Sequence, residues 1–155
     1  MISAGAAGER KGHTMAYKVE SMEVWSGTLE DEPGSLARKL APLSAAGINL
    51  EFVLARRDKP GSGLWFAAPI KGVNGARTAK AVGLKKDALL GALRIIGPDK
   101  KGLGQEITEA LANARINLRA VSAATVGGTS VLWFAFDGKK DSGKARQILR
   151  RILAR

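Results

Sequence analysis

The chain has 155 residues, of which 45% are hydrophobic, and it contains no cysteine and one histidine, His13. This composition is typical of a folded protein; it excludes disulfides, thiol catalysis and cysteine-ligated metals, and a lone histidine disfavours histidine-rich metal sites and most acid–base catalysis at neutral pH. The net charge of +11 is concentrated in residues 71–96 (+5) and 139–155 (+6), which leaves the remainder close to neutral.

The N-terminal residues 1–15 are small, polar and glycine-rich, so we expect a disordered extension. They lack the pattern of a signal peptide, and no apolar run reaches the roughly 18 residues of a membrane span. A cytoplasmic protein is therefore expected. Residues 8–12 have codons compatible with a purine-rich ribosome-binding site, so a start of translation at Met15 is a further hypothesis.

The tetrapeptide LWFA occurs at Leu64–Ala67 and again, 68 positions later, at Leu132–Ala135. With this offset, residues 31–70 match residues 99–138 at about one position in three, without a gap. The sequence therefore predicts a duplicated module, with residues 16–86 as the first copy and residues 87–155 as the second.

In the first copy, residues 21–31 and 48–58 have the apolar content of strands, and a third strand carries the first LWFA. Residues 35–47 and 73–83 predict helices; the first has leucines at helical spacing and ends in a glycine. Only the short stretch GLKKD (83–87) is left to form a fourth strand.

In the second copy, residues 88–99 and 116–126 and the stretch with the second LWFA predict strands, and residues 103–115 and 142–155 predict helices. The chain ends inside this last helix, so Ala16–Glu20, ahead of the first strand, is our candidate for the missing edge strand. The order of elements predicts an α+β fold of two ferredoxin-like (βαββαβ) modules, each an antiparallel sheet with both helices on one face.

Strand alternation assigns the residues of the repeated tetrapeptide to opposite faces of the sheet. The leucine and phenylalanine of each copy are predicted to face the helices: Leu64, Phe66, Leu132 and Phe134. Trp65 and Trp133 are then predicted on the opposite face, buried at an inter-module or inter-subunit contact.

Both copies resemble the opening of the ACT domain, a small regulatory module. Its pattern is a strand, an Asp or Asn two residues before Pro-Gly or x-Gly, an amphipathic helix, and Gly-Ile-Asn-Ile or similar at the next strand. The first copy matches with Asp31, Pro33, Gly34 and residues 47–50. The second matches with Asp99, Gly102 and residues 116–118, but has Lys101 and Arg115 where the pattern has Pro and Gly.

The resemblance covers residues 20–155. It implies that a small ligand, most often an amino acid, binds at the first strand–helix loop and an adjoining module's interface. It also implies a regulatory role in amino-acid metabolism or transport. Most ACT proteins carry a catalytic or DNA-binding domain, for which no residues remain here.

The first loop has residue types that suit an amino-acid ligand. A helix N-terminus favours a carboxylate, and Gly34 allows close approach to the backbone. Asp31 can accept hydrogen bonds from an ammonium group, and Asn49 can donate and accept. Each residue also has an ordinary role in a turn. The candidate ligand-binding residues of this copy are Asp31, Glu32, Pro33, Gly34, Ser35 and Asn49.

The second loop supplies the corresponding candidates Asp99, Gly102, Leu103 and Asn117. Lys100 and Lys101 replace Glu32 and Pro33, which favours either a more acidic ligand or a solvated turn. The two sites therefore need not be equivalent.

These observations predict a non-catalytic regulatory protein that forms a homodimer, binds an amino acid or similar metabolite, and acts on a regulated enzyme or transporter. No catalytic residue, metal or cofactor is expected, because no phosphate-binding loop or metal-ligand cluster is found. One alternative is an ACT-like interaction module without a ligand. Nucleic-acid binding is a less favoured alternative, for which Arg146, Arg150 and Arg151 would supply charge.

Overall fold

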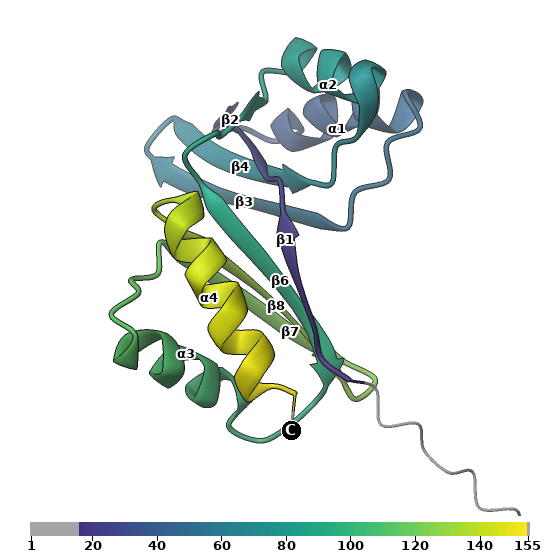
Figure 1. The fold of residues 1–155 in the computed structure, drawn as a ribbon. Coiled ribbons are helices and arrows are strands. Elements are labelled where there is room, and N and C mark those ends of the chain that lie inside the picture. The colour runs from purple at the N-terminus through teal and green to yellow at the C-terminus, as the bar shows by residue number, and fades with distance from the viewer. Residues whose placement is uncertain (1–15, 155) are drawn as a thin grey trace, which may run out of the picture.

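The computed structural model describes residues 16–154. They form two modules, each a four-stranded antiparallel sheet that carries two helices on one face (Figure 1). The expected extension over 1–15, His13 and the hypothetical start at Met15 lie outside the described residues. Within 16–154, no helix is long and apolar enough to cross a membrane.

The first module follows the ferredoxin-like order of elements, with the sheet order β3-β4-β2-β5. Its elements are β2 (Trp25–Glu30), α1 (Ser35–Ala45), β3 (Phe52–Lys59), β4 (Ser62–Ala68), α2 (Gly72–Ala81) and β5 (Lys85–Lys86). The short strand β5 lies inside the predicted GLKKD stretch and pairs with the start of β2.

The second module repeats this plan with the sheet order β7-β8-β6-β1. Its elements are β6 (Gly91–Pro98), α3 (Leu103–Asn113), β7 (Ala120–Val126), β8 (Thr129–Phe136) and α4 (Lys139–Ile152), together with β1 (Lys18–Met22). The predicted α+β fold of two ferredoxin-like modules is confirmed.

The N-terminal strand β1 supplies the edge that the second copy lacks, as expected for Ala16–Glu20. It pairs antiparallel with β6, from Lys18 opposite Ile96 to Met22 opposite Ala92. The whole first module is therefore inserted in the sequence between two neighbouring strands of the second sheet. The predicted boundaries, 16–86 and 87–155, assign β1 to the first copy by its position in the sequence. The division of the chain into two folding units at these boundaries remains a prediction.

Basic residues of α4 hold β1 in place. Nε and Nη2 of Arg150 donate hydrogen bonds to the carbonyl oxygen of Val19 at 3.2 and 3.0 Å. Nη1 of Arg146 donates to Oγ of Ser21 at 3.1 Å. Part of the positive charge in residues 139–155 therefore has a structural role, which weakens the case for a nucleic-acid surface on these two arginines.

Each module has its own core between its sheet and its helices. In the first, the largest fully buried side chains are Leu43, Trp65 and Leu84. In the second, they are Leu93, Ile95, Ile107, Leu111, Phe134, Phe136 and Leu149. A smaller cluster around Val24, Ala68 and Ala92 joins the two modules.

The repeated tetrapeptide faces opposite ways in the two copies. Leu132 and Phe134 lie in the helix-facing core and Trp133 lies on the other face, as predicted. Trp133 contacts Phe52 of the first module but is only half-buried, so its predicted burial is incomplete. In the first copy the prediction is wrong: Trp65 is 0% exposed in the helix-facing core, while Leu64 and Phe66 face away from the helices.

The reversal follows from the pairing register. Trp65 lies opposite Gly27, and Leu132 lies opposite Ile95, which corresponds to Gly27 at the 68-residue offset. Trp65 therefore occupies the structural position of Leu132, although the sequence repeat aligns Trp65 with Trp133. A Cβ atom on Gly27 would lie 2.9 Å from Nε1 of Trp65, so the glycine makes room for the larger side chain.

The hairpins explain this shift of one residue. In the first module the β3–β4 register shifts between Arg57 and Lys59, whereas β7 and β8 pair without a break around Gly127 and Gly128. Because side chains alternate along a strand, one additional residue moves every later side chain to the other face.

Candidate functional site

The loop between β2 and α1 borders an open cavity of about 440 Å³, which we call the first-loop cavity. Gly34 has a φ of 85°, a left-handed conformation that glycine adopts without steric cost, and α1 begins at the next residue. The cavity is lined by the end of β2, the loop, the first turn of α1, the end of β3 and the start of β4, including Glu30, Asp31, Glu32, Pro33, Ser35, Arg56 and Arg57.

Charged groups of opposite sign are paired around this cavity. Nε of Arg57 lies 2.7 Å from Oδ2 of Asp31, whose side chain is 28% exposed. Glu32 forms an exposed ion pair with Arg38 of α1. The cavity therefore presents a carboxylate and a guanidinium group side by side.

The first turn of α1 is attached to β2 through a buried hydroxyl group. Oγ of Ser35, a residue only 3% exposed, donates a hydrogen bond of 2.7 Å to Oε2 of Glu30. This hydrogen bond is the main cause that lowers the pKa of the Glu30 carboxyl group. The contact fixes the helix N-terminus beside the cavity.

Asn49 does not join the other candidates within one chain. It is exposed and precedes β3, whose first residue, Phe52, pairs with Ala68 at the end of β4 that is remote from the first loop. The 11 residues of α1 separate the two loops by about 16 Å. The structure thus gathers Asp31, Glu32, Pro33 and Ser35 at the cavity and places Asn49 at the opposite end of the module.

The second loop is built differently. The Asp99 carboxylate accepts hydrogen bonds from Oγ of Ser130 at 2.7 Å and Oγ1 of Thr125 at 3.3 Å. Thr125 stands where the first copy has Arg57, so no arginine faces this carboxylate from that position. Lys100 pairs with Glu106 at 2.8 Å.

The remaining candidates of the second loop are scattered. Gly102 has a φ of 81° and lines an open cavity of about 490 Å³ together with Lys100 and Lys101. Leu103 is 4% exposed, and its side chain belongs to the core. Asn117, like Asn49, is exposed and lies beyond the far end of its helix.

Sequence reasoning missed three charged residues of the first-loop cavity: Glu30, Arg56 and Arg57. The two arginines could have been found from the Arg56-Arg57 doublet near the end of the predicted strand 48–58. An antiparallel hairpin returns the end of this strand to the loop that opens the module, so the doublet could have been placed beside Asp31.

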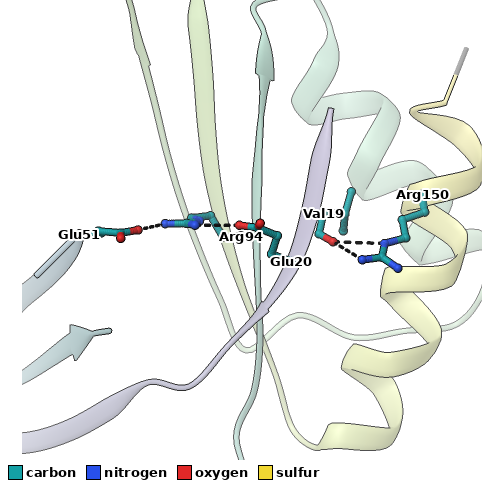
Figure 2. A network of polar contacts seen from close by, with 5 residues as sticks. All are labelled: Val19, Glu20, Glu51, Arg94 and Arg150. Atoms are coloured by element: carbon teal, nitrogen blue, oxygen red, sulfur yellow. Dashed lines mark hydrogen bonds and ion pairs between the residues drawn. The ribbon is translucent and has the colours of Figure 1, made fainter. Parts of the chain in front are cut away.

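A second polar network joins the two modules (Figure 2). Arg94 of β6, with a side chain 20% exposed, donates a hydrogen bond of 2.7 Å to Oε2 of Glu20 and forms an ion pair with Glu51 of the first module. The hydrogen bond from Arg94 is the main cause that lowers the pKa of Glu20. It is likewise the main cause that raises the pKa of Arg94.

Within residues 16–154, no group of three or more histidine, aspartate or glutamate side chains is placed to hold a metal ion. No protein-family model and no curated protein sequence matches the chain. Solved structures do. Protein BT0572 from Bacteroides thetaiotaomicron has a TM-score of 0.72 at 12% identity, over 86% of this chain and 90% of that protein.

Two aspartate kinase structures are also similar. The ligand-free regulatory subunit of aspartate kinase from Thermus thermophilus has a TM-score of 0.63 at 12% identity, over 88% of this chain and 95% of the subunit. E. coli aspartokinase III in complex with aspartate and ADP has a TM-score of 0.59 at 15% identity, over 92% of this chain and 35% of the enzyme. At these identities the likeness is one of fold, and it agrees with the two ferredoxin-like modules that the internal repeat predicted and with the resemblance to ACT domains noted in the sequence.

Proposed function

We propose that the protein is a non-catalytic regulatory protein that binds an amino acid at the first-loop cavity. The observation that carries this proposal is the pairing of Asp31 with Arg57 beside the N-terminus of α1. A free amino acid has one positive and one negative group, and this cavity offers a partner for each.

The charges suggest how the ligand would be oriented. The ammonium group would replace the guanidinium of Arg57 as the partner of Asp31. The ligand carboxylate would then lie between the released Arg57 and the first turn of α1, whose backbone N–H groups favour a negative charge. The fold shared with a regulatory subunit of aspartate kinase supports a regulatory role for this binding.

A second copy of the chain would complete the site. Strand β3 forms an edge of the first sheet and is exposed along most of its length. If β3 pairs antiparallel with β3 of another copy, the start of one strand lies beside the end of the other. Asn49 of one copy would then approach the first loop of its neighbour, which gives this exposed residue a role in a ligand-bridged homodimer.

The proposal is tested by a thermal-shift screen of the twenty amino acids, followed by isothermal titration of those that raise the melting temperature. We expect a few hits, and an affinity at least about tenfold lower in Asp31→Asn, since a charge-assisted hydrogen bond is lost. Asp58→Asn is the matched control, because it makes the same change of carboxylate to amide on β3, where Asp58 approaches Arg56 only at 3.8 Å.

A ligand-free assembly module is the second candidate. The edge strand β7 pairs on one side only, is exposed along most of its length and has no charged residue between Ala120 and Val126. Such an edge favours pairing with another chain. A screen without any hit, together with a dimer in sedimentation that Val121→Lys converts to a monomer, would favour this function over amino-acid binding.

A further inference from the structure

A second and more apolar cavity lies between the modules, and we call it the inter-module cleft. It encloses about 390 Å³ where the helix-free faces of the two sheets approach each other. In Figure 1, α1 and α2 lie on the side of the first sheet that faces away from the second module. The main apolar lining residues are Phe52, Leu54, Leu64 and Phe66 of the first sheet and Trp133 and Ala135 of the second.

The walls of the cleft are aromatic and incompletely covered. The ring centroids of Phe52 and Trp133 are 5.2 Å apart, at an interplanar angle of 36°, so one ring from each module meets at the cleft. Both side chains are only half-buried. The volume is in the range of roughly 300–1,000 Å³ that is usual for small-molecule sites, and aromatic walls of this kind are common in them.

The charged groups that line the cleft are two arginines and one aspartate: Arg56, Arg119 and Asp87. Oδ1 of Asp87 accepts hydrogen bonds from the backbone N–H groups of Leu89 and Leu90, so this oxygen already stabilises a turn. The arginines have distant partners, with Arg56 at 3.8 Å from Asp58 and Arg119 at 4.0 Å from Asp137. The charge at the cleft is therefore positive.

An apolar cavity with a positive border selects a ligand with an apolar body and an anionic head. A second copy of this chain fits less well, because it would bring the same two arginines to the contact and add positive charge to positive charge. A carboxylate would instead find Arg56 or Arg119, and a ring would pack against Phe52 and Trp133.

We propose that the inter-module cleft is a binding site for a small aromatic carboxylate, separate from the first-loop cavity. Its ring lies between the two sheets, and its carboxylate pairs with Arg56 or Arg119. Since the walls come from both modules, such a ligand would favour the arrangement of modules that closes on it. Arg56 borders both cavities, so it connects the cleft to the first-loop site.

The tryptophans supply the readout. Of the three, Trp25 and Trp65 lie in the core of the first module, and Trp133 lines the cleft. Titration of the ¹⁵N-labelled protein with indole-3-acetate should shift the indole N–H resonance of Trp133 and leave those of Trp25 and Trp65 in place. Indole-3-acetamide, the neutral analogue, should bind about tenfold or more weakly, because it cannot form the ion pair.

Variants locate the carboxylate. Arg56→Gln with Arg119→Gln should lower the affinity for indole-3-acetate by about tenfold or more. Arg77→Gln is the control, since Arg77 is exposed on α2 and contacts Asn74 of the same helix. Asp31→Asn, which disables the proposed amino-acid site, should leave indole-3-acetate binding intact, so the two proposals fail separately.

Three results would overturn the proposal. The first is no shift of the Trp133 resonance at millimolar probe. The second is equal affinity for indole-3-acetate and its amide. The third is a dimer in sedimentation that Leu64→Asn converts to a monomer. Leu64 lines the cleft from the central strand β4, so this result would show that a second copy covers the cleft.

Discussion

Two matching residues show what a single side chain contributes to this fold. Gly47 and Arg115 each follow the first helix of their module, and both have a left-handed backbone, with φ of 73° and 56°. Glycine adopts this conformation freely, whereas a residue with a Cβ atom does so at a cost of roughly 1–2 kcal/mol. Arg115, which replaces the glycine of the ACT pattern, is therefore a site of backbone strain.

Arg115→Gly should stabilise the protein by about 0.5–1 kcal/mol, because relief of strain exceeds the entropy that glycine adds to the unfolded chain. Gly47→Ala should destabilise it by about 1 kcal/mol. No neighbouring atom lies within 4 Å of a Cβ atom placed on Gly47, so this loss would reflect backbone strain and not a steric clash. Urea unfolding of both variants measures these changes. A loss of stability in Arg115→Gly would show that its side chain matters more than its backbone.

The repeated tetrapeptide marks the limit of prediction at this scale. Alternation correctly placed Leu132 and Phe134 in the core and Trp133 on the other face. It failed for Trp65, because the register shift near Arg57 reverses the faces of β4. A bulge depends on the geometry of a hairpin, which the spacing of apolar residues along one strand does not reveal.

At the scale of the elements, the sequence predicted both helix pairs and all three long strands of each module, since these have clear periodicity and turn residues. It predicted a candidate for the second module's edge strand, but not the contacts that hold it. These contacts come from α4, far away in the sequence, where Arg150 bonds to Val19.

Arg150→Gln should therefore lower the free energy of unfolding by about 1 kcal/mol, since a hydrogen bond from a charged donor is lost at a partly exposed site. Arg151→Gln, an exposed neighbour on the same helix, should change it by less than about 0.5 kcal/mol. Hydrogen exchange of the β1 amides provides a local readout. Equal exchange rates in the two variants would mean that the α4 arginine does not hold β1.

At the scale of the whole molecule, the insertion of the first module between β1 and β6 gives two covalent links between the modules. The Glu20–Arg94–Glu51 network and the apolar cluster around Val24, Ala68 and Ala92 add non-covalent connections. The sequence could not predict this arrangement, because the orientation of two modules depends on the contact of their surfaces and not on the pattern within each. For the same reason, the first-loop residues were recognisable in the sequence while the inter-module cleft was not.

The network makes the molecule sensitive to acid. The pKa of Glu20 is lowered below its ordinary value of 4.5, mainly by the hydrogen bond from Arg94, so the folded state favours the carboxylate. This stabilisation is present above pH 4.5 and is lost as the pH falls through the lowered pKa. The lowered pKa of Glu30 acts in the same direction inside the first module.

Glu20→Gln should therefore narrow the difference in unfolding free energy between about pH 7 and about pH 3.5, because the variant has no carboxylate to protonate at this position. Its stability should fall below that of the wild type near pH 7 and approach it in acid. Glu109→Gln, an exposed change on α3, should keep the wild-type pH dependence. Should Glu20→Gln lose as much stability on acidification as the wild type, the sensitivity would belong to other carboxylates, and Glu30→Gln would be the next variant to measure.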